Sequence, residues 1–361
     1  GANNVAVGKG ALDANTTADN NTAVGAAALS ANTTGTGNVA VGKGALDANT
    51  TSNYSTAVGF SALTASTGAE NTAFGAYALV TCSTGIQNTA LGYSALEKVT
   101  TGQYNTAVGH KALEENLASN NTAIGFGALE ANTTGTGNVA IGVQALENAT
   151  TANYNTAVGL QALDTCTTGA NNTAVGFYAA YSLTTGTKNT ALGQSALQGC
   201  TDGVNNVAIG YEAGTADWGD ANAAVGYRAL KLNTADNNTA VGSNVLTANT
   251  TGSSNSALGY NALTANTTGL RNTALGFAAL VSNQTGNYNV AVGYDALGDY
   301  TGSNNVAVGN DALKLCSTGN NNVAVGINAM DANTTGASNT AIGAFTLDNN
   351  TTADNNTAVG Y

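Results

Sequence analysis

Five acidic residues recur at one position of a repeat and are the first candidates for chemistry. Each stands five residues after a regularly spaced glycine, with Glu115 beside one of them: Glu97, Glu114, Glu130, Glu147 and Asp164. Carboxylates stacked at the ~4.8 Å spacing of adjacent strands repel one another unless a cation such as calcium bridges them. A solvated acidic edge that discourages aggregation is the preferred interpretation, and a metal site is the alternative.

Other reactive side chains are few and lack partners of a catalytic kind. The single His110 stands beside Lys111 without an acid or serine in its motif, and is predicted to be a surface residue. The four cysteines share a column with Asn, Val and Leu, which predicts small inward-facing core residues: Cys82, Cys166, Cys200 and Cys316. Their spacing fits neither a disulfide nor a zinc site. We therefore expect no enzyme, no catalytic residue and no cofactor.

An aromatic stripe directly follows the regularly spaced glycines. Ten of 22 such positions are aromatic, among them Phe60, Tyr93, Phe126, Phe177, Tyr227 and Tyr260. An exposed row of rings suits packing between molecules, and it equally suits stacking on the sugar rings of surface glycans or host carbohydrate. Packing is the preferred interpretation.

These residues are placed by a repeat that runs from end to end. The glycine of an Ala-Val-Gly tripeptide, or a close variant, recurs 22 times from Gly8 to Gly360, at sixteen intervals of 17 residues and five of 16. Residues 1–361 are therefore expected to form a single repeat array. Seventeen residues are too few for a helical repeat, and β-branched residues around an Ala favour a short strand. We predict an all-β parallel β-solenoid of about 21 coils, with two short strands per coil and the shortening confined to a loop.

Two columns of the repeat carry structural predictions. The residue four before the glycine is Asn in 21 of 22 repeats, which predicts a ladder of side-chain amides between coils: Asn21, Asn38, Asn71, Asn88, Asn105 and Asn121. The residue two before it is Ala in all 22 repeats. If the flanking Thr/Val and Val/Ile point inward, this Ala points outward. An outward position that never varies predicts a covered face, either by another copy or by a loop of the same coil. We prefer self-association through the flat Ala-rich face: Ala23, Ala40, Ala57, Ala73, Ala90 and Ala107.

Composition excludes several classes of function. The net charge of −12 and the 8% of charged residues argue against nucleic-acid binding. No apolar run approaches the ~18 residues of a membrane span, so no membrane insertion is expected in this segment. One coil departs from the pattern between Gly210 and Gly226, with Gly214 in the Leu column and the only Trp at 218. It is predicted to be a local defect that caps or bends the rod, in preference to a binding spot.

The strings Asn172-Thr173-Ala174-Val175-Gly176 and Asn138-Val139-Ala140-Ile141-Gly142 resemble the head repeats of trimeric autotransporter adhesins and similar repeats of phage and prophage tail-fibre proteins. The resemblance covers the whole chain on about six residues per repeat. It implies a left-handed β-roll, three chains packed through one sheet, and an extracellular rod that is not an enzyme. The family's usual repeat is shorter and lacks the Leu-x-x-Asn-Thr-Thr-Gly extension.

The expected function is a structural, adhesive filament outside the cell or on its surface, with itself as partner in a trimer or filament. The alternatives are a phage tail-fibre shaft on a virion and, less in keeping with the sequence, an ice-binding or polysaccharide-acting solenoid. The Thr-Thr-Gly loops and their many Asn-x-Thr sequons also suggest glycans on Thr or Asn. Because the sequence starts and stops inside a repeat, it is expected to belong to a longer fibre or to a subunit that polymerises.

Overall fold

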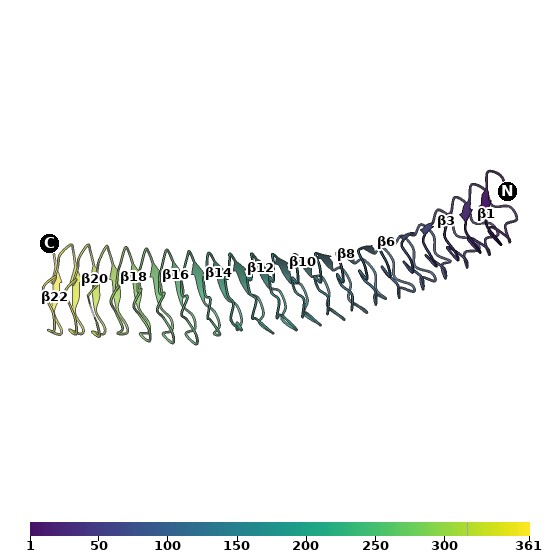
Figure 1. The fold of residues 1–361 in the computed structure, drawn as a ribbon. Helices are drawn as coiled ribbons and strands as arrows, with labels where there is room; N and C mark the ends of the chain where they lie inside the picture. Colours follow the sequence, from purple (N-terminus) through teal and green to yellow (C-terminus); the bar gives the residue numbers. More distant parts are fainter. Residues whose placement is uncertain (316) are drawn as a thin grey trace. The chain divides into compact units, whose positions relative to one another are not determined.

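A computed structural model describes residues 1–315 and 317–361. The chain divides into two compact units, Gly1–Thr185 and Gly186–Tyr361. Each unit is a stack of coils with one short parallel strand per coil (Figure 1). The predicted all-β solenoid is therefore confirmed, with its 17-residue coil spacing.

Every strand consists of the three residues before a repeat glycine. The first unit contains β1 (Val5–Val7), β2 (Thr22–Val24), β3 (Val39–Val41), β4 (Thr56–Val58), β5 (Thr72–Phe74), β6 (Thr89–Leu91), β7 (Thr106–Val108), β8 (Thr122–Ile124), β9 (Val139–Ile141), β10 (Thr156–Val158) and β11 (Thr173–Val175). The second unit contains β12 (Thr190–Leu192), β13 (Val207–Ile209), β14 (Ala223–Val225), β15 (Thr239–Val241), β16 (Ser256–Leu258), β17 (Thr273–Leu275), β18 (Val290–Val292), β19 (Val306–Val308), β20 (Val323–Val325), β21 (Thr340–Ile342) and β22 (Thr357–Val359).

The strands keep one register through long and short coils alike. Ala23 pairs with Ala40 across a 17-residue coil, and Ala57 pairs with Ala73 across a 16-residue coil. The missing residue is therefore taken from outside the strand, as predicted for the shortened loops. The repeat glycine itself admits no side chain, because a Cβ on Gly25 would lie 2.4 Å from the carbonyl oxygen of Gly42 in the next coil.

The prediction of a second strand in each coil is wrong. After the glycine the chain forms a series of turns, in which the Leu of the repeat has a positive φ, such as 54° at Leu12 and 52° at Leu29. A left-handed residue cannot continue an extended strand. The turns are still joined from coil to coil, since the Leu12 amide donates to the Ala28 carbonyl at 3.1 Å and the Leu29 amide to the Ala45 carbonyl at 2.9 Å.

The predicted orientation of the strands is also wrong. The middle Ala of each strand points into the coil and is fully buried: Ala23, Ala40, Ala57, Ala73, Ala90 and Ala107. Its neighbours on either side, such as Thr22 and Val24, are partly exposed. The inside of the coil is filled by the Ala-Leu pair that follows the glycine, for example Ala28 and Leu29, both fully buried. Only a small residue fits opposite that layer, so the Ala column cannot be a surface for self-association.

The irregular coil is closed by its own tryptophan. Trp218 is 1% exposed and donates from Nε1 to the Leu230 carbonyl at 3.2 Å. A Cβ on Gly214 would lie 2.1 Å from the Trp218 ring, so the indole fills the space that Leu occupies elsewhere. Strands β13, β14 and β15 pair without interruption through this coil. The irregular coil therefore does not cap the stack, contrary to one part of the prediction, and its tryptophan is buried.

Candidate functional site

The Asn column before each strand forms the predicted ladder. Asn21 donates from Nδ2 to the Gly35 carbonyl at 2.8 Å, and its Oδ1 accepts from the Asn38 amide at 2.9 Å. The same bonding recurs along the predicted residues. The backbone N–H groups of Asn88, Asn105 and Asn121 each donate to the side-chain Oδ1 of the Asn in the preceding coil. These side chains are buried and satisfy backbone groups at the turn. Their role is structural.

The column seven residues after the glycine is inward, as predicted. Asn49 donates from Nδ2 to Asn32 Oδ1 at 3.1 Å, which makes a second, interrupted ladder. Cysteine takes the same place, with Cys82 Sγ and Cys166 Sγ each 3.5 Å from a glycine carbonyl three residues on. Burial raises the pKa of these thiols, and that of Cys200, to about 11. They are therefore protonated core residues at neutral pH. Cys316 lies outside the described residues.

The acidic column is held by lysine and amide side chains. Lys111 Nζ lies 3.0 Å from Glu114 Oε2 and 3.3 Å from Glu130 Oε1, and Lys98 pairs with Glu115. Gln144 donates to Glu147 at 2.9 Å. Within residues 1–315 and 317–361, no group of three acids, cysteines or histidines is placed to hold a metal ion. The column is best described as an edge of local ion pairs.

Asp164 is the one strongly perturbed carboxyl group of this column. It is 5% exposed, and burial followed by the charge of Glu147 raises its pKa to about 6. Asn148 donates to its Oδ1 at 3.3 Å and Gln161 to its Oδ2 at 3.4 Å. Packing and like charge account for the shift, so it does not by itself indicate catalysis.

The aromatic column, defined as the residue directly after each repeat glycine, is exposed as predicted. Many of its rings stack on the ring of the next coil. His110 lies between Tyr93 and Phe126 at 5.3 Å from each, and it belongs to this stack although sequence reasoning set it apart. Phe277 lies 5.4 Å from Tyr260 and 5.1 Å from Tyr294 in nearly parallel planes. A ring inside such a stack offers only its edge to solvent, so sugar stacking requires a ring at the end of a stack.

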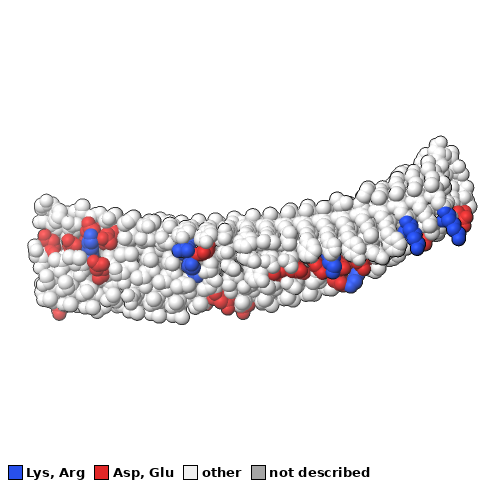
Figure 2. All heavy atoms as spheres, in the orientation of Figure 1, with Lys and Arg blue, Asp and Glu red and all other residues white. Residues whose placement is uncertain are grey.

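A further surface feature is the outer strand face, formed in each unit by the first and third residues of every strand. The first residue is Thr, Val, Ala or Ser, and the third is Val, Ile, Leu or Phe, so the face carries no charge in any coil. Several third residues are well exposed, such as Leu91 at 49% and Leu258 at 46%. Figure 2 shows that the charged residues on one side of the molecule gather in a few clusters and leave uncharged stretches between them.

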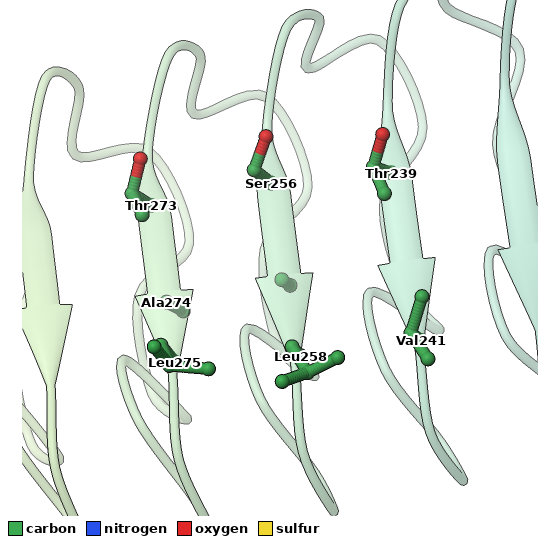
Figure 3. A pocket seen from close by; sticks show the side chains of 8 residues that line it. Thr239, Val241, Ser256, Leu258, Thr273, Ala274 and Leu275 are labelled. Carbon is green, nitrogen blue, oxygen red and sulfur yellow. The ribbon is translucent and has the colours of Figure 1, made fainter.

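A hollow of about 210 Å³ lies on this face in the second unit. Its walls are residues of β15, β16 and β17: Thr239, Val241, Ser256, Ala257, Leu258, Thr273, Ala274 and Leu275. Figure 3 shows the Thr, Ser, Val and Leu side chains on the near side of the strands and Ala274 behind them. Along the hollow, Ser256 lies between Thr239 and Thr273 at one end of the strands, and Leu258 lies between Val241 and Leu275 at the other. Sequence reasoning missed it, although Ser256 is a visible exception in its column.

The sequons fall into two groups. Asn32, in an Asn-Thr-Thr sequon, is fully buried and cannot carry a glycan. Asn20, in the Asn20-Asn21-Thr22 sequon, is exposed at the turn before the strand. Glycosylation of Asn therefore remains a prediction for exposed sequons such as this one, and glycosylation of the loop Thr residues remains a prediction as well.

No family model matches the chain, and no curated protein matches it. Over residues 1–315 and 317–361, the structure holds no helix with the length and apolar character needed to cross a membrane.

Proposed function

We propose that this chain is a structural, non-enzymatic rod-forming protein that associates with other copies of itself through the outer strand face. The observation that carries the proposal is that this face is uncharged in every coil and that the third residue of every strand is apolar. Single exposed apolar residues are ordinary on a protein surface, whereas a continuous apolar stripe indicates an interface. Eleven strands at ~4.8 Å give each unit such a stripe roughly 50 Å long.

A second copy of the chain fits this face better than an unrelated partner. The stripe repeats with the period of the coil, and another copy offers the same period, so contacts made in one coil recur in the next. Strands lie in one register through long and short coils, which keeps the two arrays in step. The resemblance to trimeric adhesin repeats supports three copies, an extracellular or cell-surface location and an adhesive role.

The test introduces a charge on the outer strand face. Sedimentation velocity compares the wild type with a Leu91→Lys/Leu258→Lys double variant and with the control Ala48→Lys, at an exposed turn position on another side of the coil. We expect assemblies for the wild type and the control, and single chains for the double variant. Circular dichroism checks that all three remain folded. A wild type that stays a single chain at all concentrations contradicts the proposal.

A further inference from the structure

The aromatic column of the second unit is interrupted for a single coil between two ring stacks. Tyr211 and Tyr227 stack at 5.6 Å with their planes 9° apart, and two coils later Tyr260, Phe277 and Tyr294 continue in the same column. Between the two stacks the column holds Ser243. Because the rings follow one another along the stacking direction of the coils, their faces are turned toward the neighbouring coils. Tyr227 and Tyr260 therefore each turn one face toward the coil of Ser243.

The gap has the width of one missing ring. Tyr227 and Tyr260 are two coils apart, which is ~9.6 Å at the spacing of adjacent strands. Both rings are well exposed, at 43% and 48%, while Ser243 between them is half-buried and forms the floor. Arg228, whose guanidinium carbon lies over the Tyr227 ring at 4.9 Å from its centroid, donates from Nε at 2.9 Å to Glu212 in the preceding coil. We call the position of Ser243, where the ring between Tyr227 and Tyr260 is missing from the column, the slot.

The first unit provides an internal comparison for this slot. There the column holds Ala76 between Phe60 and Tyr93, and the next residue, Tyr77, places its ring in the space. Its centroid lies 5.4 Å from that of Phe60 and 5.8 Å from that of Tyr93, edge-on to both at 76° and 84°. A gap of this kind therefore accepts a six-membered ring. An edge-on ring takes up more room along the stack than a ring stacked face to face, so the gap is wider than one parallel ring needs. In the second unit the residue equivalent to Tyr77 is Asn244, so the slot has no such filler.

We propose that the slot between Tyr227 and Tyr260 binds one pyranose ring of a carbohydrate. A planar ring midway would lie ~4.8 Å from each wall, beyond the ~3.5–4.0 Å of good carbon–carbon contact. A saturated sugar ring is thicker, because its axial C–H bonds project above and below its mean plane toward both tyrosine faces. The Ser243 hydroxyl can exchange hydrogen bonds with a sugar hydroxyl.

The hollow on the outer strand face lies beside the slot. Val241, in its wall, is two residues before Ser243, and Leu258, also in its wall, is two residues before Tyr260. The inference rests on the adhesive part of the proposed function and gives it a ligand class.

The test is calorimetric titration with a panel of α- and β-linked hexose oligosaccharides, maltohexaose and cellohexaose among them. We expect at least one to bind the wild type saturably at one site per chain. Ser243→Tyr completes the aromatic column, so it should abolish binding while the chain stays folded. Tyr260→Ala removes one wall and should weaken binding about tenfold, the equivalent of ~1.4 kcal/mol for one lost ring contact.

A gain of function provides the sharper control. Tyr77→Ala should open the equivalent slot between Phe60 and Tyr93 and raise the stoichiometry from one to two sugars per chain. The proposal is overturned if no oligosaccharide of the panel binds the wild type, if Ser243→Tyr binds as the wild type does, or if Tyr77→Ala leaves the stoichiometry at one. Sedimentation of the same samples reports self-association separately, so its presence or loss distinguishes failure of the slot from failure of the interface.

Discussion

The indole of Trp218 occupies the space that a side chain at position 214 would need, since a Cβ on Gly214 would lie 2.1 Å from Trp218 Cζ2. The two departures from the repeat therefore compensate each other. We predict that Trp218→Thr alone leaves a cavity and costs about 3–5 kcal/mol of the free energy of unfolding. Gly214→Leu alone clashes with the indole and is also destabilising. Urea unfolding followed by circular dichroism measures both.

The double variant Gly214→Leu/Trp218→Thr restores the usual residue types at these two positions of the coil. It should be more stable than either single variant, because Leu then fills the space that the indole leaves. Additive losses in the double variant would show that the two positions do not share one cavity.

The Asn ladder should show a graded response at Asn88. Its Nδ2 donates to the Gly102 carbonyl at 2.9 Å, and its Oδ1 accepts from the Asn105 amide at 3.0 Å. Asn88→Ala leaves both backbone groups buried without these partners, so we expect a loss of about 2–4 kcal/mol. Thermal and urea unfolding measure the loss.

Asn88→Ser is the matched control, because the chain already uses a serine in this ladder. Ser55 Oγ accepts from the Asn71 amide at 3.3 Å. The serine variant should therefore recover part of the stability lost in the alanine variant. Equal losses for the two substitutions would contradict a hydrogen-bonding role for the column.

Asp164 should make the first unit less stable as the pH rises. Its ordinary pKa is 3.8, and in the folded chain burial and the Glu147 charge raise its pKa to about 6. Well below pH 4 the Asp164 carboxyl group is protonated in both the folded and the unfolded chain. Between pH 4 and pH 6 it is protonated mainly in the folded chain, so unfolding releases a proton. The free energy of unfolding therefore falls from about pH 4 to pH 6 by up to ~3 kcal/mol.

Asp164→Asn should flatten this slope and raise the stability at pH 7. Denaturant midpoints of the wild type and the variant between pH 4 and pH 8 give the comparison. The variant leaves unchanged the residues that surround the carboxyl group, which are Glu147, Tyr181, Asn148 and Gln161. Parallel pH profiles for the two proteins would rule out Asp164 as the cause.

The thiols of Cys82, Cys166 and Cys200 should be unreactive in the folded chain. Burial raises the pKa of each thiol to about 11, so very little thiolate forms at pH 8, and the side chains are shielded from reagent. In a Cys316→Ser background, a disulfide reagent should label all three only in denaturant. Rapid labelling without denaturant would contradict their buried position.

The sequence predicted the coil and the ladder well because both follow directly from residue types at a fixed period. The orientation of the strands was not accessible in the same way. The alternation of side chains along a strand predicts that Thr22 and Val24 share the face opposite Ala23. It does not predict which of the two faces is inside the coil. The usual expectation that β-branched residues point inward failed because Leu29 and Ala28 already fill the narrow coil. The invariance of the Ala column reflects this crowding.

Two other features depend on geometry that residue types do not encode. Leu carries no signal for the positive φ that it adopts at Leu12 and Leu29, so the residue types do not show that turns stand in place of a second strand. The aromatic column was visible in the sequence, yet the gap at Ser243 has meaning only once the rings are known to stack. The filler Tyr77, one residue out of the column, likewise becomes evident only in three dimensions.

The most direct test of the central claim is cryo-electron microscopy of the intact particle, at a resolution that separates neighbouring strands. The account predicts that a second copy covers the first and third residues of the strands, such as Thr22 and Val24, while Ala23 stays inside each coil. Particles that contain a single chain with this face in solvent would contradict it.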